Sequence, residues 1–144
     1  MQDALLVVHA ASALVLIGLI WTVQVVHYPL MRLVGSDRFV AYEAAHAPRM
    51  AAVVMLPWTT QGITTLGLIL ARPAGVTCSS VAVAAATAAV PVLVTIVWSV
   101  PAHARLGAGF DAHTHARLVR TNWIRTWSWT AHGANAVAML VRAG

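Results

Sequence analysis

The chain has 144 residues, of which 60% are hydrophobic and only 9% are charged. Soluble domains are about 45–50% hydrophobic and about 25% charged, so this composition excludes an ordinary soluble domain and favours a protein of the lipid bilayer. The net charge of +5 comes from arginines in short segments between apolar runs. This distribution is typical of residues that flank membrane helices, and we expect no nucleic-acid partner. The single cysteine, Cys78, excludes an intramolecular disulfide and a cysteine-cluster metal site.

The first predicted transmembrane helix covers about residues 4–31, a run without a charged residue. A span needs about 20 apolar residues, so this run is long enough to cross the bilayer. It ends in "VQVVHYPLM", which gathers Gln24, His27 and Tyr28 beside a proline. Because such polar groups are costly beside lipid, we expect them to face the interior of a helical bundle.

Three further spans are predicted at about residues 50–71, 79–100 and 122–141. The second and third contain proline or glycine, which packed membrane helices tolerate. The fourth carries Arg125 and a cluster of tryptophans at one end, where an aromatic belt would lie. We therefore predict one all-α domain over residues 1–144, an integral membrane four-helix antiparallel bundle.

Short helices are also predicted in loops one and three, which follow the first and third spans. Ser36 or Asp37 can cap one over "RFVAYEAAHA", which Pro48 would end or kink, and Asp111 can cap the other over "AHTHARLVRTN". The arginine distribution places these two loops in the cytoplasm and both termini outside. The arginines on the side of loops one and three are Arg32, Arg38, Arg49, Arg105, Arg117, Arg120 and Arg125, against Arg72 and Arg142 on the other side.

This topology gathers polar residues from all four spans at the cytoplasmic end. We predict that His27, His46 and His103 share a metal ion there. Glu43 precedes His46 by one helical turn and is placed to orient its imidazole, as carboxylates do for metal-bound histidines. Each residue taken alone is also ordinary at the headgroup level, where it needs no cofactor. The residues expected to support the ligands or to line the pocket are Gln24, Tyr28, Glu43, Arg49, Asn122 and Arg125.

An alternative cofactor site would have His9 and His132 as its ligands. His9 shares a helix face with His27 but lies roughly 27 Å from it along the axis, so the two cannot bind one metal. His9 could instead pair with His132 as the axial ligands of a haem. In loop three, His113 and His115 point to different faces of a helix, so we interpret the preceding aspartate as a cap rather than a ligand.

The segments "IWTVQVVHYPLM", "FVAYEAAHAPRM" and "VPAHARLGAGFDAHTHARLVRTNWIRTWSW" resemble a family of small four-helix bacterial membrane proteins with no assigned activity, over most of the chain. The layout of a long helix that ends in an aromatic-proline turn is more distantly similar to anthrone oxygenase-like proteins, which implies oxidation of a polycyclic phenolic substrate. The segment "VVHAASALVLIGLIWTVQVVHYP" is similar to the first helix of the small membrane-bound protoporphyrinogen oxidases, which implies haem binding through His9. These resemblances imply a multi-pass protein of the bacterial cytoplasmic (inner) membrane.

Two functions stay open at this point. The first is an integral membrane redox protein that binds a metal or haem at the cytoplasmic histidine cluster. Imidazole ligands suit iron, copper or zinc, and haem b is the other cofactor considered. The second is a non-catalytic membrane module: a small transporter, a lipid-binding bundle or an accessory subunit. The expected partners are the lipid bilayer, a small hydrophobic substrate, and further copies of the chain or a larger membrane complex.

Overall fold

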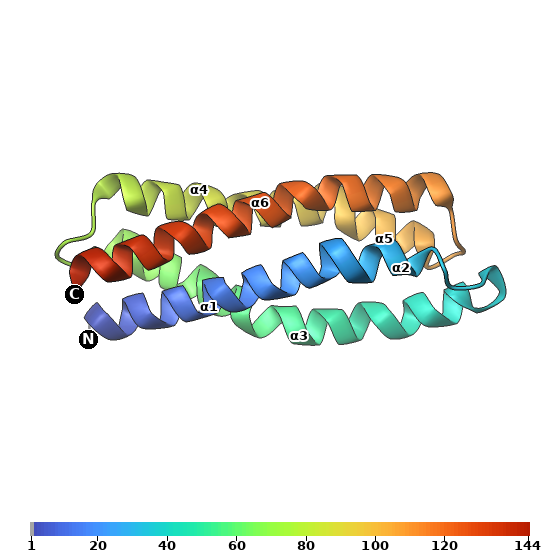
Figure 1. Cartoon of the computed structure of the whole chain (residues 1–144), viewed down its shortest axis with the longest axis horizontal. Helices are drawn as coiled ribbons and strands as arrows, with labels where there is room; N and C mark the ends of the chain where they lie inside the picture. Colours follow the sequence, from blue (N-terminus) through green and yellow to red (C-terminus); the bar gives the residue numbers. More distant parts are fainter. Residues whose placement is uncertain (1) are drawn as a thin grey trace.

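The computed structural model describes residues 2–144, and within them it contains helices joined by short turns. Four helical rods lie side by side, and the connections between them alternate between the two ends of the molecule (Figure 1). The N- and C-termini lie together at one end (Figure 1). Short connections favour this arrangement, because a turn of a few residues returns the chain alongside the helix just completed.

The first and third rods each contain one π-helical turn. The first rod comprises α1 (Gln2–Thr22), the π-helical turn η1 (Val23–His27) and α2 (Tyr28–Met31). The third comprises α4 (Cys78–Val94), the π-helical turn η2 (Thr95–Ser99) and α5 (Val100–Leu106). In both rods a proline, Pro29 or Pro101, follows the turn. Proline lacks the N–H that continues the helical ladder, and π-helical turns are frequent at functional sites.

The second and fourth rods are single helices, α3 (Ser36–Leu70) and α6 (Ala112–Ala143). The segments that we predicted as separate loop helices are their first turns. α3 runs through Pro48 without a break; in an apolar environment a helix keeps its remaining backbone hydrogen bonds because nothing else can replace them.

The caps of these two helices differ from each other. Asp111 caps α6 as predicted, since its carboxylate accepts a hydrogen bond of 2.7 Å from the backbone N–H of Thr114. This bonding holds the pKa of Asp111 below its ordinary value. The capping position of α3 is Gly35, not the predicted Ser36 or Asp37, and no side chain caps this helix.

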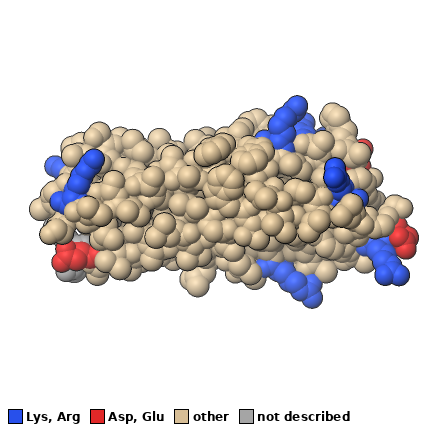
Figure 2. All heavy atoms as spheres, in the orientation of Figure 1, with Lys and Arg blue, Asp and Glu red and all other residues tan. Residues whose placement is uncertain are grey.

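Three rods are long and apolar enough to span a membrane, namely Asp3–Met31, Ser36–Leu70 and Cys78–Leu106. Many of their exposed side chains are large and apolar; Leu56, for example, is 74% exposed. On the face drawn in Figure 2, charged side chains lie toward the two ends and the middle has none. An apolar belt of this kind is what a bilayer requires of the surface that it contacts.

α6 is not among these three helices, because it carries many polar residues. In its middle part these residues face inward: Asn122, Thr126 and His132 are fully buried, and Arg125 is only 8% exposed. α6 packs along both α1 and α4, and α3 packs against α1. By contrast, α3 makes few contacts with α5, and the space between them contains the candidate site.

Candidate metal centre and cavity

A cavity of about 640 Å³ lies between α3 and the end of the third rod, with α1 and α6 behind it. This volume is within the usual range of small-molecule sites, about 300–1,000 Å³. Most of its wall is apolar, and a few polar side chains gather at one side. The apolar residues of the wall include Leu16, Ile20, Met50, Val54, Trp58 and Val100.

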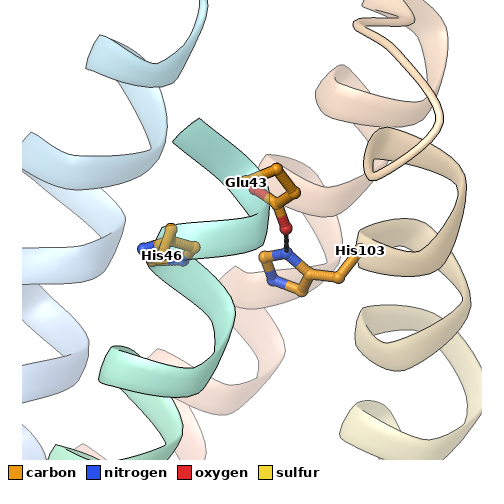
Figure 3. A group of neighbouring side chains, drawn as sticks. All are labelled: Glu43, His46 and His103. Carbon is orange, nitrogen blue, oxygen red and sulfur yellow. Dashed lines mark hydrogen bonds and ion pairs between the residues drawn. The ribbon is translucent and has the colours of Figure 1, made fainter. Parts of the chain in front are cut away.

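Glu43, His46 and His103 form the polar side of the cavity, and each can offer a ligand atom to one ion. These three atoms lie within 4.8 Å of one another (Figure 3). Glu43 is buried, and its Oε2 atom has no hydrogen-bond partner. Two imidazoles and one carboxylate are the donor set of many catalytic zinc sites and of non-haem iron sites. The arrangement could therefore hold a metal ion.

The local structure of the rods brings these residues together. Glu43 and His46 are one turn apart on α3, so they share a face. His103 comes from α5, directly beyond η2, and Tyr28 begins α2, directly beyond η1. The hydroxyl of Tyr28 lies 3.2 Å from Nε2 of His103. Both proline-associated π-helical turns thus precede a residue of the site.

Glu43 bonds a different histidine from the one that its spacing suggested. Its Oε1 atom lies 2.5 Å from Nδ1 of His103, whereas we expected it to orient His46. A carboxylate beside Nδ1 holds the proton there and leaves the lone pair on Nε2 of His103, which faces the hydroxyl of Tyr28 and is the ring nitrogen available to a metal ion. The contact joins α3 to α5 across the cavity (Figure 3).

His27, which we predicted as a ligand, lies next to the group of three. Its ring stacks on that of His46, with centroids 4.3 Å apart, and its Nε2 atom lies 3.3 Å from the hydroxyl of Tyr42. The structure therefore brings all three predicted histidines to one end of the bundle. The three donors that lie close enough to hold one ion, however, include the carboxylate of Glu43 and not His27.

Three of the residues predicted to support the ligands or to line the pocket do line the cavity: Tyr28, Glu43 and Arg125. Arg125 donates from Nη1 to Oγ of Ser99 at 3.3 Å, and its guanidinium carbon lies 5.1 Å from the ring centroid of Trp129. A buried arginine over an indole ring makes a cation–π contact that favours this side-chain position. It places one positive charge at the cavity wall.

The other predicted pocket residues do not line the cavity. Asn122 donates from Nδ2 to Oε1 of Gln24 at 2.7 Å, and Gln24 donates to the backbone carbonyl of Val119, so this pair fastens α6 to the first rod. Arg49 is exposed and donates to the carbonyl of Ala45 in its own helix.

Sequence reasoning missed one buried contact that supports the site. Nε2 of His115 donates to the backbone carbonyl of Tyr28 at 2.7 Å and so holds the backbone at the start of α2. The two residues are 87 positions apart, and no spacing rule connects them. The only sequence signal is that His113 and His115 were expected to point to different faces of a helix.

His9 and His132 are fully buried, and their rings meet edge to face with centroids 4.9 Å apart. Axial haem ligands stand on opposite faces of a flat macrocycle, whereas these two rings contact each other. The pair therefore does not present the haem slot that we considered from the sequence.

Comparisons of the chain with protein-family models, with curated proteins and with solved structures found no match. The geometry of the site is the basis for the function proposed below.

Proposed function

We propose that this chain is a multi-pass protein of the bacterial cytoplasmic membrane that binds one metal ion at Glu43, His46 and His103. In this proposal it acts as an oxidoreductase on a small hydrophobic molecule that enters the cavity from the bilayer. One observation carries the proposal above the others. A buried carboxylate with an unpartnered oxygen lies within ligand distance of two imidazoles, at the polar side of an apolar cavity.

The membrane part of the proposal rests on the distribution of polar groups. Polar residues such as Gln61, Asn122 and His132 are buried, while many large apolar residues are exposed, and broad exposed apolar surface marks contact with a membrane or a partner. α6 would be the fourth span of an antiparallel bundle, because none of its polar residues from Asn122 to His132 is exposed. The arginine bias places the turns at residues 32–35 and 107–111, and with them the metal centre, on the cytoplasmic side.

The metal part rests on the cost of an unpaired buried carboxylate. A buried polar atom without a partner costs roughly 1–3 kcal/mol, and more when it is charged. An ion bound to Oε2 of Glu43 would remove that cost. Three donors, two imidazoles and one carboxylate, leave coordination positions open, which is the pattern of non-haem Fe(II) oxygenases. We therefore expect iron first, with zinc and copper as the other ions that imidazole favours.

The substrate class follows from the cavity wall. Apolar side chains from α1, α3 and α5 would exclude water and bind a flat apolar molecule. The guanidinium of Arg125 and the hydroxyl of Tyr28 would fix a polar oxygen of that molecule near the ligand group. A bound metal would supply the electron-transfer chemistry, and the protein would supply position and charge. A phenol or quinone has this combination of a flat ring and a polar oxygen.

The non-catalytic alternative is a lipid-binding bundle, and the same apolar wall favours it. The two functions differ in what the purified protein contains. The protein should be extracted in mild detergent without oxygen, loaded with Fe(II), desalted and examined by elemental analysis. The redox proposal predicts about one iron per chain, most of it lost in Glu43→Gln and His103→Ala and retained in the matched surface variant Arg49→Ala.

Equal iron content in all four folded proteins would contradict a site at Glu43 and His103. A wild-type protein that folds, stays free of metal and co-purifies with lipid would favour the lipid-binding function. Circular dichroism in the same detergent would establish that each variant is folded.

A further inference from the structure

A second polar cluster lies inside the bundle, far from the ligand group of Glu43, His46 and His103. It centres on His9 of α1 and His132 of α6, both completely buried. Between His9 and His27 the first rod rises roughly 27 Å, so this pair lies near the opposite end of the bundle. None of its residues lines the cavity described above.

The hydrogen bonds of His9 determine where its ring proton lies. The hydroxyl oxygen of Thr64 lies 2.9 Å from Nδ1 of His9 and 2.8 Å from the backbone carbonyl of Thr60. A hydroxyl has one proton and a carbonyl can only accept, so the proton of Thr64 goes to the carbonyl. Nδ1 of His9 must then donate to the hydroxyl. In the neutral ring this leaves a bare lone pair on Nε2.

His132 repeats the same arrangement from the other side of the bundle. The hydroxyl oxygen of Thr87 lies 2.9 Å from Nδ1 of His132 and 2.6 Å from the backbone carbonyl of Val83. Nδ1 of His132 therefore donates, and its Nε2 also carries a lone pair. Both Nε2 atoms are buried, and neither has a hydrogen-bond partner. Two unsatisfied acceptors on rings in contact call for a shared cation or donor.

The geometry of the two rings suits a metal ion. Two imidazoles that bind one ion at about 2.0–2.1 Å with a bent nitrogen–ion–nitrogen angle, as in a three-coordinate site that keeps one position open, have ring centroids about 5 Å apart, and the observed separation is 4.9 Å. Metal-bound histidines almost always donate their other ring N–H to an acceptor, which fixes the ring orientation. The two threonines supply that acceptor here.

The charge of the ion follows from the surroundings. The chain has four acidic residues, and in the part that the structure describes none of them is bonded to either ring. Burial of a charge without a counter-ion is costly, and a monovalent ion costs less than a divalent one. Copper is also well suited to imidazole ligands.

We propose that His9 and His132 bind one Cu(I) ion through their Nε2 atoms, at a site separate from the Glu43 centre. Its existence does not depend on the function proposed above. The ion would join α1 to α6 and, through the two threonines, would involve α3 and α4 as well. All four rods would thus hold the ion at the end of the bundle that contains the termini.

The test uses the full chain in detergent, with the first centre removed by Glu43→Gln and His103→Ala. Cu(I) is titrated without oxygen against a coloured Cu(I) chelator. This background should still take up one Cu(I) per chain, and adding His132→Ala should abolish the uptake. Thr87→Val, which removes the acceptor of Nδ1 but keeps both ligands, should weaken binding by about 10–100-fold. Arg49→Ala serves as the matched control and should change nothing.

X-ray absorption of the Cu(I)-loaded background provides a measurement that does not depend on the folding of any His132 variant. Two nitrogen neighbours at about 2 Å support the proposal. Three results overturn it: no uptake by the background, uptake unchanged by His132→Ala, or a coordination shell without two nitrogens.

Discussion

The Nδ1 atom of His103 lies 2.5 Å from the Oε1 atom of Glu43, although the two residues are 60 positions apart. Glu43 is buried in α3, and His103 is carried by α5 on the other side of the cavity. The contact therefore sets the distance between the two helices and the orientation of one imidazole. It also leaves the second carboxylate oxygen of Glu43 for another partner.

Glu43→Gln should abolish most metal binding at the cavity. The substitution keeps the shape of the side chain but removes the charge of the carboxylate and one hydrogen-bond acceptor. We expect the Fe(II) affinity to fall by more than the roughly 100-fold that marks the loss of a supporting residue. Isothermal titration calorimetry under anaerobic conditions measures this Fe(II) affinity. An affinity within tenfold of the wild type would show that Glu43 is not a ligand.

His27→Ala separates the ligand group seen in the structure from the one predicted from sequence. His27 stacks on His46 but is not one of the three clustered donors. Its loss should therefore weaken metal binding by about 10–100-fold, the range for a supporting contact. His46→Ala and His103→Ala should cost much more in the same titration. A defect in His27→Ala as large as theirs would restore His27 as a ligand.

Tyr28→Phe should keep the metal and change the turnover of a phenolic substrate. The hydroxyl of Tyr28 lies at the cavity wall, 3.2 Å from Nε2 of His103. Its removal takes away a polar group beside the ligand nitrogen but no ligand. We expect iron content near the wild-type value and a kcat for the oxidation of a model phenol by dioxygen lower by about 10²–10³-fold, as for loss of one positioned hydrogen-bond or proton-transfer group. Loss of iron together with activity would give Tyr28 a structural role instead.

The pair of Gln24 and Asn122 should contribute to stability rather than to chemistry. Both residues are buried and bond each other between the first rod and α6. Asn122→Ala leaves a buried amide oxygen without its donor and should cost about 1–3 kcal/mol of unfolding free energy. The double variant with Gln24→Ala should cost less than the sum of the single changes. Unfolding in mixed micelles, monitored by circular dichroism, gives the unfolding free energies of the wild type, the two single variants and the double variant. Strict additivity of the two changes would argue against the contact.

Topology can be checked with reporter fusions in the turns at residues 32–35 and 107–111. Arginines flank both turns, so fusions there should report a cytoplasmic location, and a fusion after Gly144 an external one. The reverse pattern would move the metal centre to the outer side of the membrane. Fusions are best placed in the turns because insertion into the continuous helices α3 or α6 would disrupt packing.

The parts of the sequence that form three long apolar helices could be predicted, because lipid imposes a simple requirement of length and apolarity. The first and third rods follow that requirement over nearly their whole length. The helical continuity of α3 through Pro48 was not predicted, since local propensity favours a break at proline. In the folded chain the remaining backbone bonds and the packing against α1 outweigh that preference.

The contents of the site were predictable in part. The topology brings His27, His46 and His103 to one end, but it does not fix the rotation of α5 relative to α3. That rotation decides that Glu43 meets His103 and that Arg49 points outward. Likewise, the polar face of α6 is visible in the sequence, whereas the partners of Asn122 and His115 depend on packing between residues far apart in the chain.

The most direct test of the proposed metal site is anomalous diffraction at the iron edge from crystals of the full chain grown in lipid and loaded with Fe(II). We expect a single strong peak between α3 and α5, about 2.0–2.2 Å from a carboxylate oxygen of Glu43 and from one nitrogen each of His46 and His103. Loaded crystals with ordered side chains and no peak at that position would contradict it.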